Sequence, residues 1–145
     1  MADEGIGIAA LRLLGQMHRW PGNVRLLDGG TGGIMLMREI MECDFLLVLD
    51  AALGPGKPGS FYLLDGEDLA GPLGFRASMH QGSLADLLCM CQWAGHRPVA
   101  QVLAFEPFAI SGPAAGPTEE ALALLPAYCG KALELLAQRG IRPLA

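Results

Sequence analysis

Hydrophobic residues form short uninterrupted runs in the middle of the chain and helix-spaced patterns towards both ends. The run at residues 45–49, Phe-Leu-Leu-Val-Leu, contains five apolar residues with no polar alternation. Such a run predicts a strand that is buried on both faces, as in a parallel sheet. The run ends at Asp50, and ligands of open α/β sheets bind at the carboxyl ends of the strands. Asp50 is therefore a candidate functional residue, although aspartate also occurs at strand ends because it favours turns.

The residues before this run predict a helix followed by a β-α-β unit. Apolar positions across residues 6–17 follow the three-to-four spacing of one buried helix face, with Asp3 as the N-cap and an end near His18. Val24–Leu27 predicts a short strand, and a helix from about Ile34 to Glu42 connects it to the central run. We expect this crossover to be right-handed.

The second half of the chain predicts two more strands and two more helices. A strand at Ser60–Leu64 follows a link that is too short for a crossover, so it should run antiparallel. A long loop at 65–82 should lead into a helix that runs from the capping box at Ser83 to Gly95. A strand at Val99–Phe105 and a proline-rich linker at 113–117 should follow. The last expected element is a helix from Thr118 to about Arg139, with a kink at Pro126 and a stop at Gly140. The order predicts one α/β domain at residues 1–145, with three α/β/α layers around a mostly parallel twisted sheet that has one antiparallel strand.

Composition narrows the class of protein and its partners. The formal net charge is -5 and no basic cluster occurs, which argues against nucleic acid or an anionic membrane as a partner. No apolar run approaches the roughly twenty residues of a membrane span. The start, Met-Ala-Asp-Glu, is acidic where a secretory signal would be basic, which predicts a cytoplasmic protein. The four cysteines lack zinc-site spacing and should be reduced thiols.

A dinucleotide-binding fingerprint provides one alternative interpretation. Gly5-x-Gly7-x-x-Ala10 fits the pattern, and Asp28 stands near the position of a ribose-binding acid. The fingerprint requires a strand directly before its first glycine, and none is predicted there. Asp3 and Glu4 would also place negative charge where a pyrophosphate must bind. A truncated dinucleotide-binding domain is therefore the weaker hypothesis.

Three side chains could form a metal site, namely Glu4 at the first helix, Asp50 at the central strand and His80 in the long loop. Two carboxylates and an imidazole suit a borderline divalent metal such as nickel, zinc or iron. Each residue also has a simpler interpretation. Glu4 could be a helix-terminal charge, and His80 could be a solvated loop residue.

The chain contains four fragments in a fixed order: Met-Ala-Asp-Glu-Gly-Ile-Gly at 1–7, Leu-Leu-Asp-Gly-Gly-Thr at 26–31, Val-Leu-Asp-Ala at 48–51 and Ser-Met-His-Gln at 78–81. Together these fragments resemble the nickel-iron hydrogenase maturation endopeptidases. The resemblance runs from residue 1 to the final helix. It implies a monomeric endopeptidase that removes a C-terminal extension from the hydrogenase large-subunit precursor after nickel has been inserted.

The resemblance also implies roles for individual residues. Glu4, Asp50 and His80 would bind nickel, which is carried by the precursor rather than held by the protein. The glycine-rich loop, formed by Asp28, Gly29, Gly30 and Thr31, would act in recognition or catalysis. Because no nucleophile–base pair is evident, we expect an aspartyl type of mechanism in which Asp28 or Asp50 assists a metal-bound water as base. A non-catalytic module that inspects nickel loading is the competing hypothesis.

One departure from the family pattern concerns the start of the chain. Members of the family begin with an apolar strand and a Gly-Asn turn, and Met1 stands only three residues before Glu4. The resemblance therefore implies an N-terminally truncated domain whose first central strand is missing. In a sheet of order 2-1-3 that strand would lie between residues 24–27 and 46–49. We expect an open gap there rather than direct pairing of the two segments.

Overall fold

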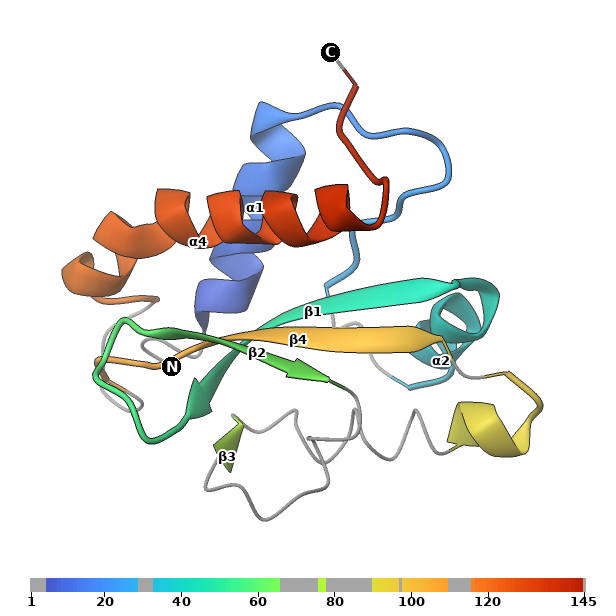
Figure 1. Ribbon diagram of the computed structural model, residues 1–145, viewed down its shortest axis with the longest axis horizontal. Helices are drawn as coiled ribbons and strands as arrows, with labels where there is room; N and C mark the ends of the chain where they lie inside the picture. Colours follow the sequence, from blue (N-terminus) through green and yellow to red (C-terminus); the bar gives the residue numbers. More distant parts are fainter. Residues whose placement is uncertain are drawn as a thin grey trace.

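The computed structural model describes residues 5–28, 33–65, 76–77, 90–96, 98–109 and 116–144. The helices and strands are, in chain order, α1 (Ile6–Met17), α2 (Gly33–Glu42), β1 (Phe45–Leu53), β2 (Phe61–Asp65), β3 (Arg76–Ala77), β4 (Val99–Phe105) and α4 (Glu119–Gln138) (Figure 1). Met90–Trp93 form a further helical turn, which agrees with the end of the helix predicted before Gly95. Within these ranges, no helix combines the length and hydropathy that crossing a membrane would require.

The sheet has the strand order β2-β4-β1-β3. β1 and β4 are parallel, with Phe45 opposite Val99 and Ala51 opposite Phe105. β2 runs antiparallel, as predicted, and its neighbour is β4. The short strand β3 pairs antiparallel with the last two residues of β1. β3 was not expected, because the whole segment 65–82 was predicted to be a loop.

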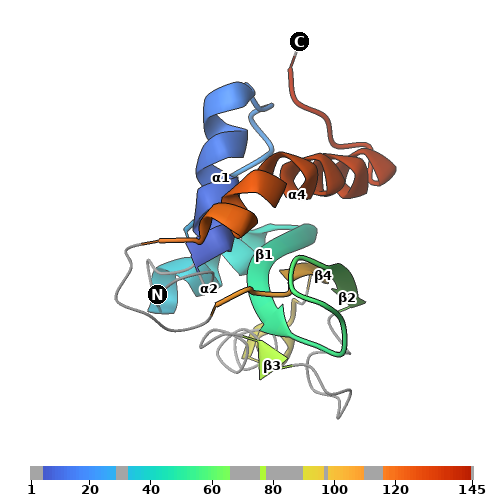
Figure 2. The same cartoon turned by 90° about the vertical axis from the view of Figure 1, so that its left-hand side faces the viewer.

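The two faces of the sheet are covered by different helices, which confirms the predicted three layers. α1 and α4 lie together over one face (Figures 1 and 2). Alternate residues of the strands, including Leu49, Ala51 and Leu103, pack against them in one hydrophobic cluster. The intervening residues, such as Val48 and Val102, pack with Ile40 of α2 in a second cluster. Because neighbouring strand residues face opposite ways and both faces are covered, residues 45–49 of β1 are all apolar.

The segment Val24–Leu27 is not a strand, which corrects the sequence prediction. A strand requires a hydrogen-bonded neighbour, and in the described chain no ladder joins this segment to β1. Along residues 45–51, the sole described strand partner of β1 is β4. The side chains of this part of β1 are half-buried except for the buried Ala51, whereas residues 102–105 of β4 are all buried. The described residues therefore confirm that Val24–Leu27 does not pair with β1, and the open gap beside β1 stays a prediction.

The helix ends follow most of the predicted signals. Thr118 caps α4, because its Oγ1 accepts a hydrogen bond from the Ala121 N–H at 3.2 Å. Gly140 follows α4 with a φ of 75°, a left-handed angle that suits glycine. Gly5, without a side-chain cap, occupies the N-cap position of α1, and the predicted cap Asp3 lies outside the described residues.

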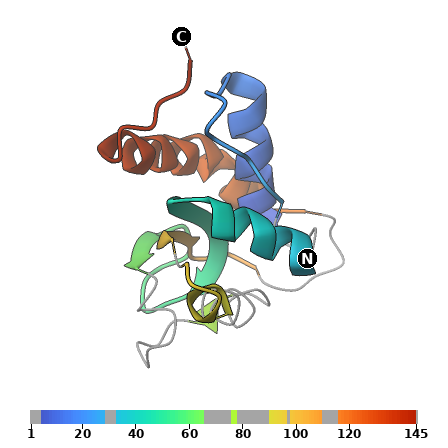
Figure 3. The same ribbon diagram turned by 90° about the vertical axis from the view of Figure 1, so that its right-hand side faces the viewer.

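After α4, the Leu144 N–H donates to the Arg19 carbonyl at 2.7 Å, which brings the end of the described chain beside α1 (Figure 3).

Candidate functional site

Asp50 lies near the carboxyl end of β1, where the sequence predicted a functional carboxylate. Its side chain is partly buried, and Oδ1 accepts a hydrogen bond from the Ala51 N–H at 2.9 Å. Because β1 and β4 are parallel, their carboxyl ends meet at one edge of the sheet. Ligands of open α/β sheets bind at this edge. Asp50 is therefore placed where a substrate could reach it.

A second carboxylate, Glu106, directly follows β4 at the same edge. Its side chain is 4% exposed, and Oε1 accepts hydrogen bonds from the Gly54 N–H at 2.8 Å and the Tyr62 hydroxyl at 3.2 Å. Its backbone continues the strand pairing through Ser60 and Gly59. Glu106 thus fixes the turn after β1. The sequence prediction missed this residue, although a charged residue directly after the apolar residues 102–105 was an available signal.

The buried Tyr128 of α4 reaches the same region from the face of the sheet that α1 and α4 cover. Its hydroxyl donates a hydrogen bond to the carbonyl of Leu103 in β4. Burial raises the pKa of Tyr128 well above its usual range, and the negative charge of Asp50 raises it further. The phenol is therefore a neutral donor. A tyrosine inside an apolar helix pattern reads as ordinary core from the sequence.

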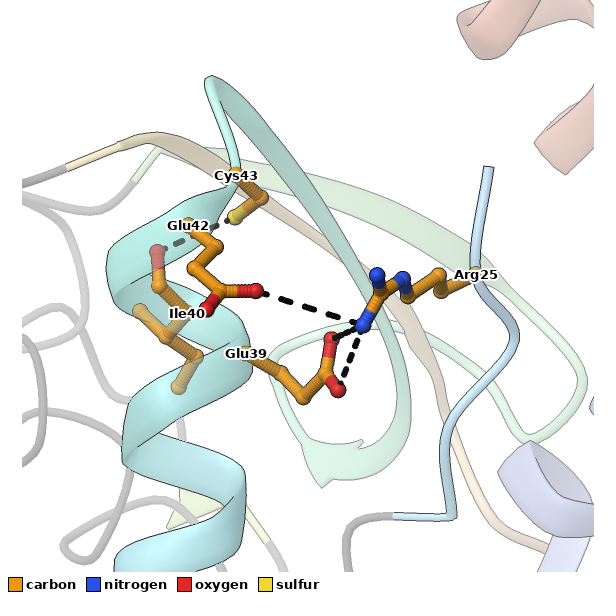
Figure 4. Close-up of polar contacts among 5 residues, drawn as sticks. All are labelled: Arg25, Glu39, Ile40, Glu42 and Cys43. Carbon is orange, nitrogen blue, oxygen red and sulfur yellow. Dashed lines mark hydrogen bonds and ion pairs between the residues drawn. The ribbon is translucent and has the colours of Figure 1, made fainter. Parts of the chain in front are cut away.

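Asp28 lies in the irregular segment 24–28 and is exposed. This segment is held against α2 by Arg25, whose guanidinium nitrogen Nη1 lies 2.8 Å from both carboxylate oxygens of Glu39 and 4.0 Å from Glu42 (Figure 4). The ion pairs fix the chain three residues before Asp28. They therefore anchor the chain at the start of the predicted recognition loop. The loop residues Gly29, Gly30 and Thr31 lie outside the described residues.

Exchanging the charges of Arg25 and Glu39 tests this anchoring role. Arg25→Glu or Glu39→Arg alone should raise KM for the substrate about three- to fivefold, the equivalent of about 1 kcal/mol for a partly exposed ion pair. The double exchange should restore most of the loss. The matched control is the exposed pair of Lys131 and Glu134, 3.4 Å apart on α4, where single charge reversals should leave KM unchanged. An equal change in KM for the single reversals at the two pairs would contradict the anchoring role.

The convergence of the predicted metal ligands is not tested, because Glu4 and His80 lie outside the described residues. Asp50 is the one member of that trio whose surroundings are described. In the described ranges, no three His, Cys, Asp or Glu side chains gather in a way that could hold a metal ion. An arrangement that includes Glu4 and His80 stays a prediction.

The described cysteines are free thiols, as the sequence predicted. Burial raises the pKa of Cys43, Cys91 and Cys129, so each stays protonated at neutral pH and is a poor nucleophile.

Gly7 offers a packing explanation for the dinucleotide-like pattern. A Cβ at this position of α1 would collide with the carbonyl oxygen of Leu49 in β1, so this glycine allows the helix to approach the strand.

Fold and site define an α/β protein with a carboxylate at the carboxyl end of a parallel strand. The model of one protein family, described as hydrogenase maturation protease, matches residues 8–134. The chain therefore belongs to the hydrogenase maturation protease family, and it is a peptidase with a role in hydrogenase maturation. This confirms the family resemblance drawn from the four sequence fragments.

Individual relatives agree with this assignment. The hydrogenase expression/formation protein HoxM of Azotobacter vinelandii is 33% identical over 142 residues, which cover 97% of this chain and 69% of the relative. The hydrogenase 2 maturation protease of Escherichia coli (strain K12) is 32% identical over 99 residues, covering 68% of this chain and 60% of the relative. The solved structure of the hydrogenase maturating endopeptidase HybD from E. coli superposes with a TM-score of 0.85 at 26% identity, covering 99% of this chain and 90% of that one.

Proposed function

We propose that this protein is an endopeptidase that removes the C-terminal extension of a nickel-iron hydrogenase large-subunit precursor once nickel has been inserted. The observation that carries the proposal is the position of Asp50. A partly buried carboxylate stands at the carboxyl edge of the parallel strands, in a chain that belongs to a family of proteases. The precursor is the proposed partner, and the nickel is part of that substrate.

In this proposal, Glu4, Asp50 and His80 recognise the nickel in the precursor. Carboxylate and imidazole donors fit a borderline divalent ion, and the surroundings of Asp50 support its share of this role. The Ala51 N–H donates a hydrogen bond to the Asp50 carboxylate and so orients it, and an ionised carboxylate can bind a cation or accept a proton. Asp50 or Asp28 then serves as general base for the water that attacks the peptide bond.

The histidines provide a test of residue choice. His80→Gln should abolish processing, because the amide cannot replace a ligating imidazole. His18→Gln and His96→Gln should leave processing nearly unchanged. The His18 ring packs edge-on against Trp20, with the ring centroids 6.1 Å apart. The His96 Nε2 lies 2.7 Å from the Cys43 carbonyl oxygen, a contact that a glutamine amide can also make. Equal losses of processing rate in all three variants would refute the assignment of His80.

The dependence on nickel separates an endopeptidase from a binding module. The protein is incubated with nickel-loaded and nickel-free precursor, and the mass of the large subunit is measured. A protease that checks nickel should shorten the loaded precursor and leave the nickel-free precursor intact. A non-catalytic chaperone-like module would bind the loaded precursor and leave its C-terminus in place. Calorimetry without precursor should find little tight nickel binding, since three protein ligands form an incomplete site.

A further inference from the structure

Tyr128 places one polar group within an apolar cluster. The residue is fully buried in α4, and its ring packs edge-to-face against Phe61 and Phe105, with centroids 5.3 and 5.5 Å away. These ring contacts would be equally available to phenylalanine. The hydroxyl therefore calls for an explanation of its own, because a buried polar group costs stability unless it is hydrogen-bonded.

The hydroxyl of Tyr128 lies where β1 and β4 pair, next to Asp50. It donates to the carbonyl of Leu103, which stands opposite Leu49 in the ladder, and the next pair is Asp50 opposite Ala104. The charge and the backbone of Asp50 both act on the pKa of the phenol, although burial has the larger effect. The hydroxyl is thus hydrogen-bonded to β4 directly beside the residue of β1 that carries the carboxylate.

The hydrogen bond of Tyr128 is made to the backbone of β4 and not to the Asp50 carboxylate. Leu47, Leu49 and Ala51 face the α1 and α4 side, so the intervening Asp50 belongs to the opposite set of positions. Tyr128 approaches from the α4 side. It can therefore fix the direction in which the Asp50 side chain leaves the strand without competing for the carboxylate oxygens.

We propose that Tyr128 is a positioning residue for Asp50: its hydroxyl fixes the Leu103 carbonyl of β4 where that strand pairs with β1 beside Asp50, and so holds the carboxylate in its working orientation. This role rests on the proposed function, because it matters for catalysis only if Asp50 acts on the substrate. Small misplacements of a reacting group can cost up to about a hundredfold in rate. The hydroxyl should therefore affect turnover more than substrate binding.

Tyr128→Phe keeps the ring and deletes the hydroxyl. We expect kcat for precursor processing to fall about tenfold or more with KM unchanged. The matched control is Cys129→Ala, because Cys129 is the buried neighbour in α4 and its thiol has a weak contact with the Ala10 carbonyl at 3.7 Å. This control should lower thermal stability by a similar amount and leave kcat within about twofold. Replacing Tyr128 with 4-aminophenylalanine, which restores a donor, should recover most of the turnover.

A readout independent of activity keeps this proposal separate from the proposed function. Amide hydrogen exchange measured by NMR should become faster at Asp50 in Tyr128→Phe than at Val102 within β4, and both sites should respond alike in Cys129→Ala. If the wild-type chain does not process precursor but Asp50 exchange responds as expected, the proposed function fails and the positioning role stands. If Tyr128→Phe changes neither kcat nor Asp50 exchange beyond the change in Cys129→Ala, the positioning role is overturned.

Discussion

Replacing Asp50 with Asn should lower the rate of precursor processing by about a thousandfold or more, the scale expected when a general base or a substrate-binding carboxylate is lost. The change is nearly isosteric. An asparagine oxygen can still accept the hydrogen bond from the Ala51 N–H, so the fold should be preserved. Rates are measured from the mass of the large subunit over time, and the thermal midpoint of the variant should stay within a few degrees of wild type.

The matched control for this variant is Asp44→Asn. Asp44 directly precedes β1, at the amino end of the same strand, and its side chain is exposed. Its backbone carbonyl accepts from the Val99 N–H at 3.0 Å, a contact that the substitution retains. Processing by Asp44→Asn should equal that of wild type. Similar losses in both variants would mean that the carboxyl edge of the sheet has no special role.

Gly7→Ala should destabilise the protein strongly, even though alanine favours helices more than glycine does. The new Cβ would collide with the Leu49 carbonyl oxygen, a backbone atom that cannot rotate away. Overpacking of this kind costs about 1–3 kcal/mol, and here it displaces β1 one residue before Asp50. We therefore expect the thermal midpoint to fall by about 5 °C or more. Processing should also fall at temperatures at which the variant is still folded.

Gly130→Ala provides the contrasting substitution. Gly130 also lies in a helix, α4, but nothing lies within 4 Å of a Cβ built there. Without a clash, the helix propensity of alanine should raise stability by up to about 1 kcal/mol. Thermal unfolding of the two variants measures the contrast directly. A neutral or stabilising effect at Gly7 would contradict the close approach of α1 to β1.

Local patterns sufficed to predict the elements whose signals lie in their own residues. Val99–Phe105 forms β4 with the predicted bounds, and α4 begins after its cap Thr118 and ends before Gly140. The apolar run at 45–49 gave the core of β1 because a strand buried on both faces needs no polar alternation. Asp50 could be singled out for the same reason, since it ends that run.

The features that the sequence missed depend on neighbours in space. Val24–Leu27 has the composition of a strand, but strand formation is decided by a partner, and the ion pairs of Arg25 hold this segment beside α2 instead. The adjacency of β2 and β4 is likewise a property of the sheet. Glu106 and Tyr128 were overlooked because their roles follow from contacts with Tyr62 and Leu103, which are distant in sequence.

The most direct test of nickel-checked proteolysis compares two precursors that differ only in their nickel content. Each is incubated with the wild-type protein and with Asp50→Asn, and the mass of the large subunit is then determined. The proposed function predicts loss of the C-terminal extension only for the nickel-loaded precursor with wild-type protein. Cleavage of both precursors, or an intact C-terminus on the loaded precursor, would contradict it.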